Sequence, residues 1–312
     1  MVDYIVANKE WLFSGVGVSA LWVIWGFLIR RNKNDSDNKY ENDDPDLASD
    51  QADEAVLVEE PRIETEAEKI SKRFRHILDL MNEGRNYSRF TVSQMAKVMS
   101  LDRVGDLDKY FHGDDEPTFE FMRKFCEAFG VNERWLAEGK SHPFSNDDRG
   151  MADPLWYHNE IKEAKPEKIF FVRENTEIAQ AFIVLQFSEL KYKLLQRAWH
   201  ISGHVGAGGR SQLLSFYRLI KRLKKFDVNF YFNDYSCRGV TLEKEEFDSL
   251  ICGEVFPGRY LGCGQSEDPW WDDLTDVYHG YPIAEDYERI YGASFIKAQE
   301  IIKWQLDKEK MV

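Results

Sequence analysis

The sequence predicts a multi-domain chain with a single transmembrane helix, an all-α domain and a C-terminal α+β domain. Three observations predict this class: an uncharged run near the N-terminus, a series of short amphipathic helical patterns, and a later part where strand patterns precede long helical ones. A length of 312 residues with 43% hydrophobic side chains is sufficient for two folded domains with sizeable cores. The same composition excludes a wholly disordered protein.

The transmembrane prediction rests on residues 11–29, nineteen residues without a charge. As a helix they would be about 28 Å long, close to the thickness of the hydrocarbon core of a bilayer. A buried helix is an alternative, whereas a signal peptide has its basic residues before the apolar run, and here Arg30, Arg31 and Lys33 follow it. The positive-inside rule then predicts a single-pass protein of the bacterial inner membrane, with residues 1–10 outside and the rest cytoplasmic.

Residues 30–68 predict an acidic, disordered linker. From Asn34 to Glu68 there are fourteen Asp and Glu residues and two basic ones, so this segment carries −12 of the total charge of −14. Such a composition cannot build a core, and its own repulsion would extend it as a tether or a solubilising spacer. The acidity of the chain therefore belongs to the linker and not to a binding face.

Residues 69–144 show the periodicity of five short helices. Thr91 is the expected N-cap of the second helix, Pro117 and Thr118 open the fourth, and Gly113 and Gly130 end the third and the fourth. Apolar side chains at three- and four-residue spacing form the inner faces: Ile70, Phe74, Ile77, Leu78, Met81, Met95, Ala96, Met99, Leu107, Tyr110, Phe121, Phe125 and Phe129. This pattern predicts an all-α domain.

Three motifs in this segment together carry a resemblance to a known family. They are Phe90–Ala96, then Tyr110–Gly113 with Glu116 and Pro117, and the ending Gly130–Leu136 with Gly139, Pro143 and Phe144. On these residues, about a quarter of the chain, the segment resembles the phage-repressor-like (Cro-type, XRE) helix-turn-helix family. The resemblance implies a DNA-binding domain that lays its third helix in the major groove and holds a phosphate at the start of its second.

The resemblance, carried over position by position, assigns residues of three helices to DNA. The start of the second helix and the third helix supply contacts, and basic residues of the first helix form a phosphate patch or a merely solvated face. The residues expected to contact DNA are Thr91, Arg103, Lys109, Lys72 and Arg73.

Three carboxylates oppose this assignment. Asp102, Asp106 and Asp108 lie at the start of the expected third helix, where they would repel the phosphate backbone. The segment as a whole carries a charge of only about +1, whereas a DNA-binding domain is usually basic on at least one face. A helix-turn-helix that binds protein instead of DNA is therefore the alternative.

Residues 152–312 predict an α+β domain because strand patterns come first and helices later. A single long helix is expected after Pro282. The expected strands are Lys168–Val172, Ala181–Phe187, Lys191–Trp199 and Val228–Phe232. The helix between the third and fourth of these strands has its apolar face at Leu213, Phe216, Tyr217, Ile220 and Leu223.

The glycine-rich turn at residues 203–211 leads into this helix. Backbone N–H groups exposed at such a turn bind anions, and a neighbouring arginine adds a charged contact. A phosphate-binding P-loop is excluded, because glycine stands where the motif requires lysine. A flexible turn without a ligand is the alternative. The expected contacts of an anionic small molecule are Gly206, Gly208, Gly209 and Arg210.

Nothing in the sequence predicts catalysis, a cofactor or a metal. The four cysteines are far apart and no Cys-x-x-Cys is present, which argues against a disulfide framework and a zinc site. His200 and His204 have metal spacing only on a helix, which the adjacent glycines oppose. The acidic residues around Trp270 and Trp271 lack the order of a calcium loop.

These observations predict a nonenzymatic, membrane-tethered bacterial transcription regulator. Its helix-turn-helix would bind DNA, its α+β domain would sense an anionic small molecule or a protein, and the chain would act as a homodimer. The alternative is a membrane-anchored signalling or defence adaptor whose helix-turn-helix binds protein. An enzyme is disfavoured, because no set of residues has the spacing that catalysis requires.

Overall fold

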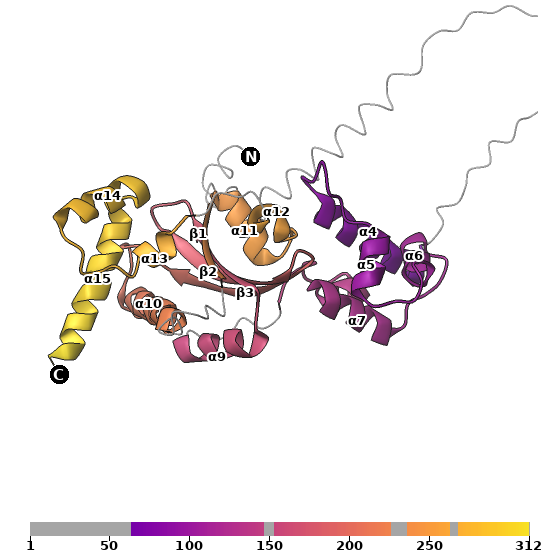
Figure 1. The fold of residues 1–312 in the computed structure, drawn as a ribbon, viewed down its shortest axis with the longest axis horizontal. Coiled ribbons are helices and arrows are strands. Elements are labelled where there is room, and N and C mark those ends of the chain that lie inside the picture. Colours follow the sequence, from indigo (N-terminus) through magenta and orange to yellow (C-terminus); the bar gives the residue numbers. More distant parts are fainter. Residues whose placement is uncertain (1–63, 147–152, 226–235, 263–267, 312) are drawn as a thin grey trace, which may run out of the picture. The chain divides into compact units, whose positions relative to one another are not determined.

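The structure is a computed structural model that describes residues 64–146, 153–225, 236–262 and 268–311. Residues Arg62–Val312 form one compact unit. A four-stranded sheet lies at its centre, with helices α11 (Lys244–Cys252) and α12 (Gly258–Leu261) on one side and α9 (Pro154–Ala164) and α10 (Ala207–Lys225) on the other (Figure 1).

The first part of this unit consists of five helices at the predicted positions. They are α4 (Glu66–Asn82), α5 (Val92–Val98), α6 (Gly105–His112), α7 (Phe119–Phe129) and α8 (Glu133–Glu138). Thr91 caps α5, and Gly113 and Gly130 end α6 and α7 in the left-handed conformation, at φ 79° and 67°. Helix α4 begins inside the stretch assigned to the linker, because Thr65 and Glu68 form a capping box there.

The sheet has the order β3-β2-β1-β4 and is mixed. Strands β1 (Lys168–Glu174), β2 (Gln180–Ser188) and β3 (Lys191–His200) lie at the positions of the three consecutive strand patterns and are antiparallel neighbours. Strand β4 (Ser236–Leu242) was not predicted. It runs parallel to β1, with Phe170 opposite Arg238. The predicted strand at 228–232 lies outside the described residues.

The helices after the sheet differ from the sequence prediction. The helix expected after Pro282 is two helices, α14 (Tyr281–Tyr291) and α15 (Ala293–Lys310), which meet at Gly292. The backbone of Gly292 has φ 88° and ψ 163°, a conformation outside the helical region that glycine tolerates. A short helix, α13 (Trp270–Asp273), precedes them.

Alternate residues of the strands enter two different cores. Phe170 and Val172 of β1 belong to a core that also contains the inner faces of α4 to α8 and of α11. Ile169 and Phe171 face the other way, into a core with α9, α10, α14 and α15. Helices α4 to α8 therefore share a core with residues from one face of the sheet instead of forming a separate all-α domain.

The predicted fold class is wrong in two respects. The described fold is mixed α/β around a sheet, not an all-α domain joined to a second one. In the four described ranges, no helix has the length and apolar character to cross a membrane, since long helices such as α15 carry charges along their length. The predicted span at 11–29, residues 1–10 and the linker up to residue 63 lie outside the described residues. Because no described helix can span a bilayer, the single-pass topology and the inner-membrane location are not retained, whereas the bilayer partner stays an untested prediction.

Candidate functional site

The start of α6 is the part of the helical segment, α4 to α8, that the resemblance would direct at a partner. Leu107, Tyr110 and Phe111 bury the inner face of this short helix in the core. Asp106 and the residues just before the helix are exposed, and Val104 retains 44% of its surface. The local sequence thus presents an acidic surface with one aliphatic side chain in it.

Thr91 and Lys109, two of the residues predicted to contact DNA, interact with other residues of the helical segment. The hydroxyl of Thr91 accepts a hydrogen bond from the backbone N–H of Gln94 at 3.2 Å, and the Gln94 side chain accepts one from the Thr91 N–H at 3.0 Å. The Lys109 amine lies 2.8 Å from a carboxylate oxygen of Asp115. This hydrogen bond raises the pKa of Lys109 and lowers that of Asp115.

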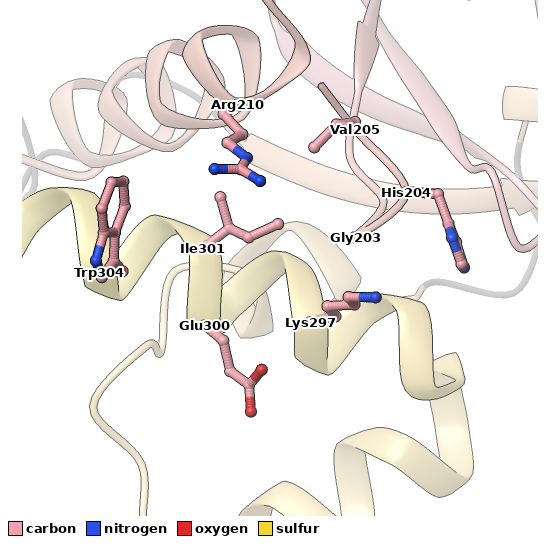
Figure 2. A pocket seen from close by; sticks show the side chains of 8 residues that line it. All are labelled: Gly203, His204, Val205, Arg210, Lys297, Glu300, Ile301 and Trp304. Carbon is pink, nitrogen blue, oxygen red and sulfur yellow. The ribbon is translucent and has the colours of Figure 1, made fainter. Parts of the chain in front are cut away.

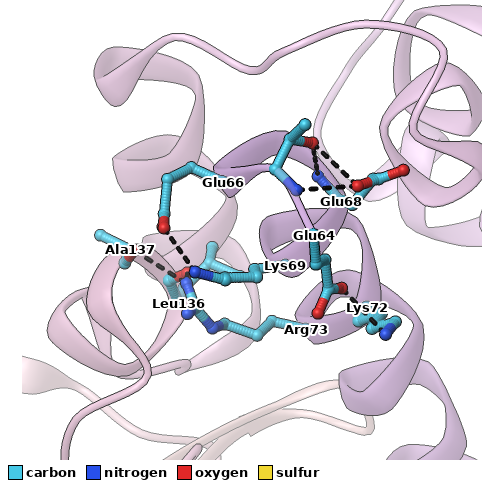
Figure 3. A network of polar contacts seen from close by, with 9 residues as sticks. Glu64, Glu66, Glu68, Lys69, Lys72, Arg73, Leu136 and Ala137 are labelled. Carbon is cyan, nitrogen blue, oxygen red and sulfur yellow. Dashed lines mark hydrogen bonds and ion pairs between the residues drawn. The ribbon is translucent and has the colours of Figure 1, made fainter. Parts of the chain in front are cut away.

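Two further predicted contacts on α4 also have partners (Figure 3). The Lys72 amine forms an ion pair with Glu64 at 2.9 Å. The guanidinium of Arg73 donates to the backbone oxygens of Leu136 at 3.0 Å and Ala137 at 2.8 Å, at the end of α8. Arg73 therefore holds two helices together and is not directed at a phosphate.

Arg103 is the fifth predicted DNA contact. Its side chain is exposed and makes no hydrogen bond or ion pair within the described part of the chain. It is flanked by the exposed Asp102 and, one turn on, by Asp106. One unpaired cation among carboxylates gives this surface little attraction for a polyanion.

A pocket of about 500 Å³ lies between the glycine-rich turn and α15 (Figure 2). Of the predicted ligand contacts, Arg210 lines it, whereas Gly206, Gly208 and Gly209 are not among its lining residues. The turn is shorter than predicted, because α10 begins at Ala207. The lining residues are Gly203, His204, Val205, Arg210, Lys297, Glu300, Ile301 and Trp304.

Sequence reasoning missed the half of this pocket that α15 supplies. Lys297, Ile301 and Trp304 follow a helical spacing of four and three residues, which indicates one face of a helix. Nothing in that spacing relates the face to a turn about ninety residues earlier.

The acidic residues around Trp270 form a hydrogen-bonded network and not an open site. The Tyr291 hydroxyl donates to Asp268 at 3.2 Å and to Asp273 at 2.7 Å. The carboxylate of Asp268 also accepts from the Thr241 hydroxyl at 2.5 Å and from the backbone N–H of Trp270 at 3.1 Å. Burial raises the pKa of Tyr291, so its hydroxyl remains a donor at neutral pH. The network fixes α13 and α14 to the sheet.

Arg173 is a buried cation beside this network. Its guanidinium donates to the backbone oxygen of Tyr291 at 3.0 Å and lies 5.5 Å from the ring centre of Phe295. Burial lowers the pKa of Arg173, and the charge of Asp268 opposes this shift. In the described ranges no group of three or more His, Cys, Asp or Glu is placed to hold a metal ion.

Comparisons of the chain with protein-family models, with curated proteins and with solved structures found no match. Two features of the structure therefore bear on function: the exposed start of α6 with Asp102, Val104 and Asp106 (the α6 surface), and the pocket beside α15.

Proposed function

We propose that this chain is a nonenzymatic binding protein whose helical segment, α4 to α8, contacts a protein partner through the start of α6. The supporting observation is the pairing of the predicted phosphate contacts. Arg73 binds the end of α8, and Lys72 and Lys109 have carboxylate partners. DNA binding, which the resemblance implies, is the alternative that the experiments below distinguish.

The ion pairs alone do not decide against DNA. An exposed ion pair contributes about 0–1 kcal/mol, so a phosphate competes easily for Lys72 and Lys109. Freeing Lys109, however, leaves the charge of Asp115 facing the phosphate backbone. Each phosphate that a protein neutralises makes the slope of log K against log salt concentration steeper by about 0.9. A carboxylate that faces the phosphates repels them and weakens this binding. The balance of attractive and repulsive charges at α6 therefore disfavours DNA binding.

The same surface suits a protein. Asp102 and Asp106 are exposed on either side of Val104 in the sequence. A partner with Lys or Arg side chains around a small apolar depression is complementary to this arrangement, since charge steers the encounter and the apolar contact adds affinity. We expect a basic, partly apolar protein surface as the partner.

DNA titration of the whole chain tests the first half of the proposal. Fluorescence anisotropy with a mixed-sequence duplex, at about 50 and 200 mM salt, should give no salt-dependent binding for the wild type. The double variant Asp102→Asn/Asp106→Asn should gain weak, salt-dependent binding, because two repulsive charges are removed. Salt-dependent binding by the wild type that Arg103→Ala weakens would contradict the proposal and support a DNA-binding regulator.

Site-specific cross-linking tests the second half. A photoreactive residue at position 104, in the cells from which the gene comes, should give a discrete protein adduct. The matched control is position 87, where Tyr87 is 88% exposed but lies outside the α6 start. Asp106→Lys should abolish the adduct at 104. Equal adducts at both positions, or an adduct with nucleic acid, would show that α6 does not bind a protein partner.

A further inference from the structure

The pocket between the glycine-rich turn and α15 is held in place by the backbone. The N–H of Gly203 donates to the backbone oxygen of Ser294 at 2.9 Å and to its hydroxyl at 3.1 Å. A Cβ at position 203 would lie 2.6 Å from Cγ of Lys297, so only glycine permits this approach. The pocket is therefore formed before any ligand binds.

The glycines at the start of α10 differ in what explains them. Gly206 and Gly208 are exposed, their φ angles are not positive, and a Cβ at either position would have no atom within 4 Å. Gly209 differs, because its Cβ would lie 2.6 Å from Cβ of Val205. Gly206 is the N-cap of α10, because its backbone oxygen accepts from the N–H of Arg210, and glycine is favoured over alanine at that position. Inside a helix glycine is destabilising relative to alanine, so Gly208 indicates a close approach to this backbone by something outside the chain.

Two cations, Arg210 and Lys297, and one carboxylate, Glu300, line the pocket, and none of the three is paired within the described residues. Arg210, Lys297 and His204 make no side-chain hydrogen bond or ion pair there. Two turns further along α10, by contrast, Arg218 binds Glu309 of α15 at 2.5 Å. Between α10 and α15, Arg218 is thus neutralised by a carboxylate, whereas the charge of Arg210 is directed at the pocket.

An apolar surface adjoins these charges. In Figure 2 the guanidinium of Arg210 lies over Ile301, between Trp304 and Val205, and the carboxylate of Glu300 points away from it. Trp304 is 56% exposed, and the amine of the exposed Lys308 lies 5.3 Å from the centre of its ring. A cation beside an aliphatic and an aromatic side chain suits an anion that carries a flat apolar group.

We propose that this pocket binds a small organic phosphate with a planar ring. The phosphate contacts Arg210, which lines the pocket, and extends beyond the lining residues to the N–H groups in the first turn of α10, where the dipole of a 19-residue helix adds to the attraction. The ring lies against Ile301 and Trp304. This site is separate from the α6 surface, so it stands or fails independently of the proposed function.

Calorimetric titration of the full chain with four probes tests the ligand class. Phenyl phosphate and adenosine monophosphate carry both parts of the proposed ligand, whereas inorganic phosphate and adenosine carry one each. At least one of the first two should bind tenfold or more tightly than both of the others. Failure of both ring phosphates to bind, or equal binding of adenosine or inorganic phosphate, would overturn the proposal.

Three variants test the site with the ring phosphate that binds. Arg210→Ala should weaken binding at least tenfold. Arg222→Ala should leave it unchanged, because Arg222 is exposed on the same helix, has no side-chain partner in the described residues and does not line the pocket. Equal effects of these two changes would overturn the proposal.

Gly208→Ala distinguishes a ligand contact from a structural glycine. We expect weaker binding together with an unchanged or higher melting temperature of the free protein, because alanine favours the helix and meets no neighbour. A lower melting temperature, or unchanged binding, would show that the close approach is not to this backbone.

Discussion

The guanidinium of Arg73 in α4 and the backbone oxygen of Ala137 in α8 form a hydrogen bond of 2.8 Å across the helical segment. A second bond from the same nitrogen reaches the oxygen of Leu136 at 3.0 Å. Carbonyl groups in the last turn of a helix lack partners within that helix. Arg73 supplies the partner here, and it thereby closes the first helix of the segment onto the last.

Arg73→Ala should lower the free energy of unfolding by about 1.5–3 kcal/mol, the range for hydrogen bonds from a charged donor. Two carbonyls lose their donor, and the packing of the aliphatic stem is lost as well. Urea denaturation followed by circular dichroism measures the change. Arg75→Ala is the control, because Arg75 is exposed and makes no side-chain hydrogen bond or ion pair in the described residues, and it should stay within about 0.5 kcal/mol. Equal losses for both variants would rule out this role for Arg73.

Capping residues made the helices of this segment predictable. Thr91 and Gly113 act locally, through hydrogen bonds and dihedral angles within a few residues, so the sequence alone locates them. Strand β4 was missed for the opposite reason. Its pairing of Arg238 with Phe170 joins residues far apart in the chain, and no local pattern encodes a parallel partner.

In the candidate sites, too, local features could be predicted from the sequence and contacts between distant residues could not. The glycine-rich turn and Arg210 are visible in the sequence, because glycine and charge patterns are local. The other wall of the pocket, Lys297 and Trp304, depends on how α15 packs, which the sequence does not show. Arg73 has the residue type of a phosphate contact, and only its position opposite the end of α8 gives it another role.

Leu136, and not the neighbouring Trp135, is the buried residue of α8. Leu136 is 0% exposed, whereas Trp135 is partly exposed and lies 5.7 Å from the ring of His76. Leu136→Ala should therefore cost about 2–5 kcal/mol, and Trp135→Ala clearly less. Chemical denaturation of the two variants measures this order. A larger loss for Trp135→Ala would show that the indole ring supports the core.

Cys126 should resist thiol reagents in the native state. Its burial raises the pKa of the thiol from 9.0 to about 12, and the thiolate is the reactive form. In the unfolded chain this thiol deprotonates near its ordinary pKa, so the contribution of Cys126 to stability is present below pH 9 and is lost as the pH rises towards 12. Iodoacetamide labelling at about pH 8, quantified per peptide by mass spectrometry, should modify the exposed Cys252 long before Cys126. Comparable rates at both sites in folded protein would contradict the burial of Cys126.

Gly130 marks the place where the helical segment meets the sheet, and Gly84 provides its matched control. Both glycines have positive φ, 67° and 74°, so alanine at either position should cost about 1–2 kcal/mol of backbone strain. The positions differ in their surroundings. A Cβ at 84 would have no atom within 4 Å, whereas a Cβ at 130 would clash with the backbone oxygen of Tyr192 in β3.

Gly130→Ala should therefore lose the strain energy plus about 1–3 kcal/mol for the forced separation of α7 from β3. Urea denaturation of the full chain should also show the loss in one transition, with tryptophan fluorescence and circular dichroism changing together, because the helices and the sheet share a core. Equal losses for Gly84→Ala and Gly130→Ala would mean that the end of α7 does not press on the strand. Two separate transitions would show that the helical segment folds independently of the sheet.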